Sequence, residues 1–150
     1  MEKFMKKALE LAAAAAAEGE VPVGALIVKD GEIISTGRNR REKHSNALYH
    51  AEIEAIDKAC KKLNRWRLFD CEIYVTLEPC PMCAGAIINS RLKRLIFGAD
   101  DLKSGSCGSV LNLFNFPYNH KPEVIRGVLK EPCAEILSDF FKNLRKNKKI

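Results

Sequence analysis

The chain has 150 residues, of which 47% are hydrophobic and 29% charged, and this balance favours a soluble globular protein built as a single domain over residues 1–150. Its 25 Lys and Arg residues outnumber its 19 Asp and Glu residues, and the net charge of +6 favours a polyanionic partner such as nucleic acid. No apolar run approaches the roughly 20 residues that span a bilayer, which excludes a membrane segment.

The chain begins with lysines and an alanine-rich run that together imitate a secretion signal. Glu2 and Glu10 interrupt this run, and alanine is only weakly apolar, so a soluble helix is the better interpretation. We therefore expect a cytoplasmic protein in a reducing compartment. There, a close pair among the six cysteines is predicted to bind metal rather than to form a disulfide.

The first part of the chain is predicted to form a helix, a β-hairpin and a second helix. The first helix is expected over residues 2–18, and the hairpin strands over 24–29 and 32–37. Residues 38–49 lack periodicity and are expected to be a polar loop. The second helix is expected over 50–63, with a buried face at helical spacing made of Ile53, Ile56, Cys60 and Leu63.

The rest of the chain is predicted to alternate the same two kinds of element. Strands are expected over residues 72–77, 94–99 and 123–129, and helices over 81–90 and from Pro132 onward. Residues 100–121 are rich in Gly, Ser and Asn and are expected to be mostly loop, with one helical turn near Val110. This alternation predicts an α/β protein, with a central sheet covered on its faces by helices.

Two cysteines mark the point where the strand over 72–77 turns into a helix. Pro79 ends the strand, and Pro81 suits the first helical turn, where its missing N–H costs nothing. Cys80 and Cys83 can therefore face one point at the helix N-terminus, where the helix dipole favours thiolates. This pair is half of a metal site, and His50 is the best candidate for the other half.

Three protein ligands, His50, Cys80 and Cys83, are typical of a catalytic zinc site that keeps one position open for water. Zinc lowers the pKa of bound water to about 7, and Glu52 is the carboxylate best placed to move its proton. Residues two apart on a helix point roughly 200° apart, so both His50 and Glu52 reach the site only if it lies at the very start of their helix.

The remaining cysteines and histidines are interpreted as parts of the core or of the surface. Small buried hydrophobic positions are predicted for Cys60, Cys71, Cys107 and Cys133. His44 and His120 are predicted to be solvated surface histidines.

A His-x-Glu motif followed by Pro-Cys-x-x-Cys is the pattern of zinc-dependent nucleobase deaminases. Further stretches carry a closer resemblance: 21–25, 50–53, 74–86, 98–101, 119–120 and 138–141. Over these residues, and nearly the whole chain, the sequence resembles bacterial tRNA-specific adenosine deaminases. It departs from them at residues 47–49, where Ala-Leu-Tyr stands in place of Pro-Thr and a small residue before the histidine.

The resemblance implies a three-layer α/β/α cytidine deaminase-like fold with a central mixed five-stranded sheet, a homodimer and one Zn²⁺ per chain. It implies conversion of adenosine to inosine at wobble position 34 of a tRNA anticodon stem-loop. Zinc-bound hydroxide would attack C6 of the flipped adenine, with Glu52 as the proton shuttle. By the same resemblance, Asn39 should contact the nucleoside, and the anticodon loop should meet Asp100, Asp101, Lys103, Phe141 and Arg145.

Several of these residues have a simpler alternative interpretation. On a helical wheel, Phe140 lies near the centre of an apolar stripe and is predicted to be core, whereas Phe141 lies about 80° away beside Arg145. Phe141 either stacks on RNA or closes the edge of the core. Asp100 and Asp101 could cap a turn. Three further cases are open. Glu78 could order the strand-to-helix turn, and Trp66 could stack on RNA or on its own domain. The C-terminal lysines could form a solvated tail.

Two rival functions share part of this pattern. A deaminase of a free base or nucleoside, such as guanine or cytidine, has the same metal core but does not need a basic C-terminal helix. An RNA-binding module stabilised by a structural zinc ion would need a fourth protein ligand for the metal, and the sequence offers no convincing one.

Overall fold

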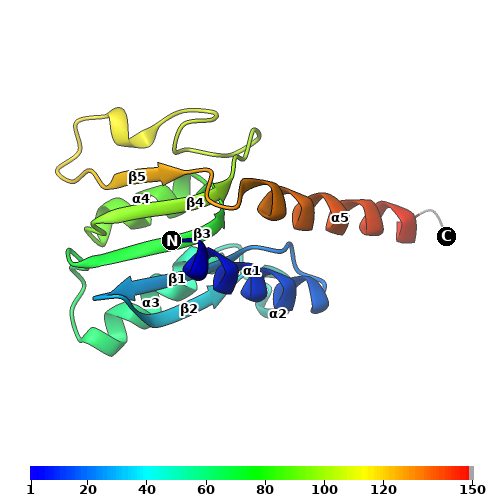
Figure 1. Ribbon diagram of the computed structural model, residues 1–150, viewed down its shortest axis with the longest axis horizontal. Helices are drawn as coiled ribbons and strands as arrows, with labels where there is room; N and C mark the ends of the chain where they lie inside the picture. The colour runs from blue at the N-terminus through cyan, green and yellow to red at the C-terminus, as the bar shows by residue number, and fades with distance from the viewer. Residues whose placement is uncertain (149–150) are drawn as a thin grey trace.

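The computed structural model describes residues 1–148 (Figure 1). Its helices are α1 (Glu2–Ala17), α2 (Arg41–His44), α3 (Ala51–Leu63), α4 (Pro81–Asn89) and α5 (Lys130–Lys148), with the 3-10 turn η1 (Leu113–Asn115). Its strands are β1 (Gly24–Lys29), β2 (Glu32–Arg38), β3 (Cys71–Leu77), β4 (Arg94–Ala99) and β5 (Glu123–Arg126). The strands and long helices predicted from the sequence are all present.

The strands form one mixed five-stranded sheet in the order β2-β1-β3-β4-β5. β1 runs antiparallel to both β2 and β3, whereas β4 runs parallel to β3 and β5 runs parallel to β4. A tight turn suffices between antiparallel β1 and β2, but the parallel step from β3 to β4 needs a crossover, which α4 supplies. The carboxyl ends of β3 and β4 therefore lie together at one edge of the sheet.

The alternation of side chains along the strands divides the core in two. Ala25 and Ile27 of β1 belong to a cluster with residues of α3 and α4, whereas Leu26 and Val28 belong to a cluster with residues of α1 and α5. Figure 1 shows α1 on the near face of the sheet and α3 and α4 on the far face. The predicted three-layer α/β/α arrangement is therefore confirmed.

Helix α3 packs very closely against β2. A Cβ atom added to Gly37 would lie 2.2 Å from the carbonyl oxygen of Ala51, so only glycine allows this approach. The buried face of α3 consists of Ala51, Glu52, Ala55, Ile56 and Ala59. The predicted face was wrong in part, because small alanines, rather than the larger apolar side chains, let the helix approach the sheet.

Three smaller predictions also differ from the structure. The polar loop contains the one-turn helix α2, and the turn predicted near Val110 lies instead at η1, where the Asn112 side chain caps Phe114 N at 3.1 Å. β5 ends at Arg126, and α5 begins before Pro132, at Lys130. Of the helices in residues 1–148, none combines the length and the apolar character needed to cross a membrane.

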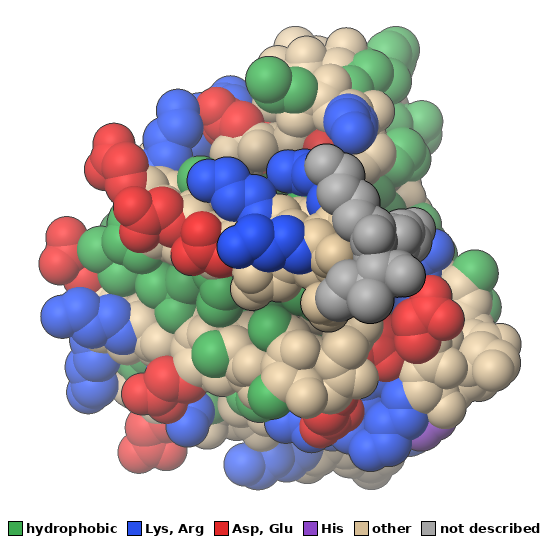
Figure 2. Space-filling view, turned by 90° about the vertical axis from the view of Figure 1, so that its right-hand side faces the viewer, with side chains coloured by type: hydrophobic (Ala, Val, Ile, Leu, Met, Phe, Trp, Pro, Cys, Tyr) green, Lys and Arg blue, Asp and Glu red, His purple; other side chains and the backbone are tan. Residues whose placement is uncertain are grey.

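Helix α5 leaves the sheet after its first turns and projects beyond it (Figure 1). Cys133 is fully buried, but Phe140 is only half-buried, and Leu144 is 41% exposed. The prediction that Phe140 is a core residue was therefore wrong, because the apolar stripe of α5 outruns the surface it packs against. Figure 2 shows Lys and Arg side chains gathered beside the projecting end of α5.

The contact at Gly37 should be sensitive to a single methyl group. We expect Gly37→Ala to lower the free energy of unfolding by about 1–3 kcal/mol, because the helix must move away from β2. The matched control is Gly85→Ala in α4, where an added Cβ meets no atom within 4 Å. That change should raise stability by about 0.5–1 kcal/mol. Urea unfolding measures both, and a Gly37→Ala protein as stable as wild type would contradict the close packing.

Candidate active site

Two helix N-termini meet at the carboxyl edge of β3. His50 is the residue before α3, and Cys80 is the residue before α4; both have extended backbone conformations. His50 Nδ1 lies 3.6 Å from Cys80 Sγ and 3.5 Å from Cys83 Sγ. The structure therefore brings together the three residues that the sequence singled out, as a group able to hold a metal ion.

The spacing of these atoms fits a tetrahedral zinc ion. Zn–S bonds of about 2.3 Å and Zn–N bonds of about 2.0–2.1 Å at tetrahedral angles place sulfur and nitrogen about 3.5–3.6 Å apart. The two observed N···S distances, 3.6 and 3.5 Å, match this value. A hydrogen bond with the Cys83 thiol lowers the pKa of Cys80 to about 4, so the pair already favours one thiolate. Thiolate and imidazole donors are also the chemistry that zinc prefers.

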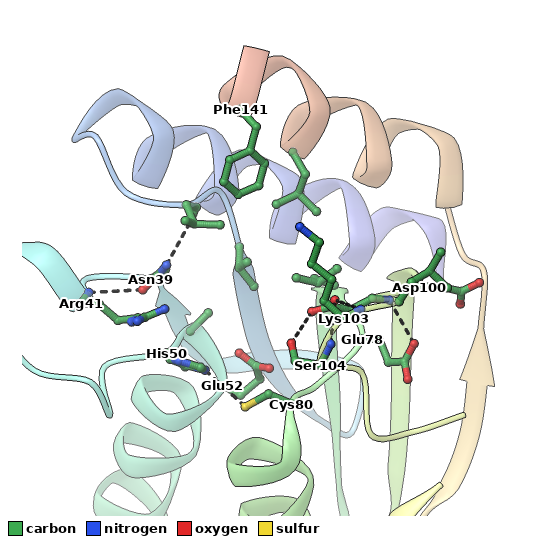
Figure 3. Close-up of a pocket in the computed structure, with 17 residues that line it drawn as sticks. Asn39, Arg41, His50, Glu52, Glu78, Cys80, Asp100, Lys103, Ser104 and Phe141 are labelled. Carbon is green, nitrogen blue, oxygen red and sulfur yellow. Dashed lines mark hydrogen bonds between the residues drawn. The ribbon is translucent and has the colours of Figure 1, made fainter. Parts of the chain in front are cut away.

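Glu52 lies in the first turn of α3, beside these three residues. His50 stands outside the helix, so its side chain does not follow the helical rotation, and both side chains can reach the same region. Glu52 is 4% exposed, and this burial raises the pKa of its carboxyl to about 7. Figure 3 shows His50, Glu52 and Cys80 together at the floor of a cavity.

The cavity above this floor has a volume of about 520 Å³, within the roughly 300–1,000 Å³ typical of small-molecule sites. One wall carries Asn39 and Arg41, and the facing wall carries residues 100–104 (Figure 3). Phe141 of α5 closes the top (Figure 3), and Leu137 of the same helix also lines the cavity. The cavity is therefore framed by segments that are far apart in the sequence.

Asn39 is held in the wall by its own hydrogen bonds. Its side chain donates to the carbonyl oxygen of Val21 at 3.3 Å and accepts from the backbone N–H of Arg41 at 3.2 Å. A side-chain amide has two donors and two acceptor lone pairs, so one of each remains for a ligand. Its predicted contact with the substrate is compatible with this geometry.

The two predicted acidic contacts, Asp100 and Asp101, are both engaged within the protein. Asp100 accepts a hydrogen bond from Arg126 at 2.7 Å, which lowers the pKa of its carboxyl, and pairs with Lys130 at 3.3 Å. The Asp101 carboxylate accepts hydrogen bonds from the backbone N–H groups of Lys103 and Ser104, at 3.0 and 3.2 Å. Asp101 therefore caps a turn, and Asp100 ties the wall to the start of α5.

Lys103 differs from these two residues. Its side chain points into the cavity (Figure 3), and within the described part of the chain it forms no ion pair with a carboxylate. Arg41, across the cavity, is likewise unpaired within residues 1–148 and was not singled out from the sequence. Only its position two residues after Asn39 could have pointed to it.

Glu78 orders a loop rather than the turn that follows it. It is 2% exposed, and its carboxylate accepts hydrogen bonds from the backbone N–H groups of Asp101, Cys107 and Ser109, at 3.0–3.1 Å. Glu78 therefore holds the loop that forms the 100–104 wall. No sequence signal indicated this role, because the partners lie 23 to 31 residues away.

The predicted contacts on α5 fall on two different surfaces. Phe141 lines the cavity, whereas Arg145 lies in a separate shallow groove on α5 with Asp139, Lys142, Asn143 and Lys146. Of the C-terminal lysines, Lys149 and the side chain of Lys148 lie outside the described residues.

Comparison with known proteins identifies the relatives of this chain. A family model described as MafB19-like deaminase matches residues 1–145. A tRNA-specific adenosine deaminase of Bacillus subtilis is 50% identical over 149 residues, covering 99% of this chain and 92% of that protein. One of Haemophilus influenzae is 50% identical over 151 residues, covering 99% and 87%. The chain belongs to the tRNA-specific adenosine deaminase family.

Solved structures of this family and of related deaminases share the fold. One from a study of A-to-I editing by tRNA:A34 deaminases at the wobble position is 42% identical, with a TM-score of 0.89, and covers 91% of this chain and 100% of that one. A guanine deaminase from Nitrosomonas europaea is 26% identical, with a TM-score of 0.82, and covers 93% and 83%. The cytidine deaminase-like fold implied by the sequence resemblance is confirmed.

The cysteines outside the metal-binding group mostly have the predicted burial, whereas one histidine differs from its prediction. Cys71, Cys107 and Cys133 are buried as predicted, and Cys60 is half-buried. The prediction for His120 was wrong, because its Nε2 lies 2.7 Å from the carbonyl oxygen of Leu92 and is not simply solvated.

Two exposed aromatic residues, Trp66 and Tyr49, lie outside the cavity lining. Trp66 stacks under the guanidinium of Arg67, 4.2 Å from the ring centroid, at the opposite end of β3 from the metal-binding group. Tyr49 stacks on His44, with 4.5 Å between ring centroids.

Loss of one ligand should abolish metal binding. We expect Cys83→Ser to lose its metal, because a serine hydroxyl does not replace a thiolate in a site with only three protein ligands. The control, Cys60→Ser, changes a half-buried cysteine elsewhere and should keep one metal ion per chain. Atomic absorption measures both. Full metal occupancy in Cys83→Ser would contradict the assignment.

Proposed function

We propose that this protein hydrolytically deaminates adenosine to inosine at wobble position 34 of tRNA anticodons. The observation that carries the proposal is the 50% identity, over 99% of the chain, to relatives named tRNA-specific adenosine deaminase. A three-residue metal-binding group at the floor of an open cavity supports the same chemistry. The substrate would enter as a single nucleotide turned out of the anticodon loop.

The proposed metal is one zinc ion per chain, held by His50, Cys80 and Cys83. When bound there, zinc supplies a hydroxide at neutral pH and leaves a coordination position open for it. Two thiolates and a neutral imidazole balance the charge of Zn²⁺.

Glu52 is the proposed proton carrier of the reaction. Its carboxylate lies at the cavity floor beside the ligands and is removed from solvent. There it takes a proton from the attacking water and passes it to N1 of adenine. It then takes the proton of the new C6 hydroxyl group and passes it to the amino group, which leaves as ammonia. The hydrogen-bonding groups left free on Asn39 orient the nucleoside against this carboxylate.

The anticodon loop is proposed to lie over the cavity mouth. Lys103 and Arg41, on opposite walls, are placed to meet the phosphates on either side of the target nucleotide. Phe141 offers a face on which a neighbouring base stacks, and Arg145 extends the basic surface along α5. Asp100 and Asp101 support this surface by holding the wall that carries Lys103.

The further proposals rest on the family resemblance and on the substrate. We propose that the chain is one deaminase domain that works as a homodimer, and that it acts in the cytoplasm, where its tRNA substrate is found.

A free-base deaminase is the rival function, since guanine deaminases share the fold. The deciding experiment offers the protein an anticodon stem-loop with adenosine at position 34, free guanine and cytidine, and measures ammonia release. Only the stem-loop should react, with inosine as the product. Faster release from guanine than from the stem-loop would overturn the proposal.

Glu52→Gln should separate chemistry from binding. The amide keeps the shape of the side chain but cannot carry protons, so turnover should fall by roughly 10²–10⁴-fold. Zinc content and melting temperature should stay close to wild type, because Glu52 is not a proposed ligand. Asp57→Asn, an exposed carboxylate on the same helix, is the control and should keep full turnover. Near-normal turnover in Glu52→Gln would refute the proton-carrier role.

Phe141 and Phe140 are neighbours with different surroundings, and this makes a matched pair. Phe141 lines the cavity, whereas Phe140 does not. We expect Phe141→Ala to weaken stem-loop binding by the ~1–3 kcal/mol typical of a base–aromatic stack. Phe140→Ala should leave binding within about twofold, and both should destabilise less than the roughly 3–5 kcal/mol of a core phenylalanine. Equal binding losses in the two variants would argue against stacking on Phe141.

A further inference from the structure

Residues 40–49, between β2 and α3, form a wall of the cavity that we call the lip. The lip contains the short helix α2 and contributes Arg41 to the cavity lining. None of its residues is buried. Hydrophobic packing therefore does not hold the lip in position, and its placement must come from polar contacts.

Glu20 supplies the central contact from beneath the lip. One carboxylate oxygen accepts the backbone N–H of Glu42 at 3.0 Å, and the other accepts that of Lys43 at 2.8 Å. These N–H groups belong to the first turn of α2, which lacks partners within its own helix. Glu20, from the connection between α1 and β1, thus caps a helix 22 residues further along the chain.

The burial of Glu20 makes this contact unusual. The residue is only 1% exposed, and within residues 1–148 no Lys, Arg or His nitrogen forms an ion pair with it. A buried carboxylate loses its hydration, and here mainly the two charge-assisted hydrogen bonds from the lip offset that loss. The lip and Glu20 therefore stabilise each other, and freeing one leaves the other unsatisfied.

Other contacts join the two ends of the lip to the cavity. Asn39 precedes the lip and accepts the remaining first-turn N–H, that of Arg41. Arg40 is the first residue of the lip, and its N–H donates to the carbonyl oxygen of Tyr49, the last residue, at 3.1 Å. The Arg40 side chain pairs with Glu54 of α3 at 3.0 Å. His50, immediately after the lip, donates its N–H to Leu48 O at 2.8 Å, but it is also tied to α3, because its carbonyl oxygen accepts the N–H of Glu54 at 3.2 Å. Loosening the lip should therefore disturb Arg41 and Asn39 but spare the metal-binding group.

We propose that Glu20 is a positioning residue that fixes the lip, and with it Arg41 and Asn39, against the flipped nucleotide and its phosphates. This role rests on the proposed function. It makes Glu20 a determinant of substrate binding although its own carboxylate does not line the cavity. A carboxylate that accepts two N–H groups is required, because an amide would direct an N–H of its own at one of them.

The test combines kinetics with amide hydrogen exchange in Glu20→Gln. We expect KM for the anticodon stem-loop to rise about 10-fold or more, the factor that charge-assisted hydrogen bonds carry. Turnover at saturation should stay within about twofold, with one zinc per chain retained. The amides of Glu42 and Lys43 should exchange about 10-fold faster or more in the free protein. If Glu20→Gln does not fold, Glu20→Asp, which keeps the charge but shortens the reach, should show the same pattern.

Glu18→Gln is the control, because Glu18 lies two residues away and pairs with Arg38 and Lys43 through side chains. It should change KM by less than about twofold, as expected for ion pairs in contact with solvent. An unchanged KM in a Glu20 variant whose lip amides exchange freely would overturn the role of Glu20, as would lip amides that stay protected. A wild-type protein that does not act on the stem-loop would instead overturn the proposed function.

Discussion

The structure depends on one constraint, that the N-termini of α3 and α4 meet at a single point. His50 Nδ1 must come within 3.6 Å of two sulfur atoms that lie 30 and 33 residues further along the chain. The antiparallel strand β1 makes this possible, because it joins β2, which leads into α3, to β3, which leads into α4. Gly37 then lets α3 lie directly on the sheet. The positive ends of both helix dipoles face the site, which favours thiolates there.

Around that point the protein concentrates its buried acidic groups. Glu52 lies at the floor of the cavity, and Glu20 and Glu78 lie behind its two walls, each less than 5% exposed. Burying a carboxylate is unfavourable unless hydrogen bonds replace the lost water. For Glu20 and Glu78 those bonds come from backbone N–H groups of the lip and of the 100–109 loop. The lip, which has no buried residue, and the 100–109 loop, which buries Cys107, are thereby fixed to the sheet, and this suits a cavity that must hold one nucleotide in a defined position.

The sequence predicted the sheet well, because continuous apolar runs and turn residues mark its strands locally. β1 and β4 have the predicted bounds, and the spacing of Cys80 and Cys83 was enough to propose their ligand pair with His50. The sequence was less informative where the position of a side chain in the fold decides whether it is buried. The face of α3 was misjudged because close approach to β2 favours alanine, and Phe140 was taken for core because periodicity cannot show that α5 runs past the sheet. The roles of Glu20 and Glu78 were not predicted, because their partners are backbone groups more than twenty residues away.

The central claim is that three protein ligands hold the metal and leave one coordination position open. X-ray absorption at the zinc edge of the zinc-loaded protein tests this most directly. The account predicts two sulfur neighbours at about 2.3 Å and two nitrogen or oxygen neighbours at about 2.0–2.1 Å, only one of them an imidazole. A third sulfur or a second imidazole would mean a closed, structural site, and would contradict the assignment of this protein as a zinc-dependent enzyme.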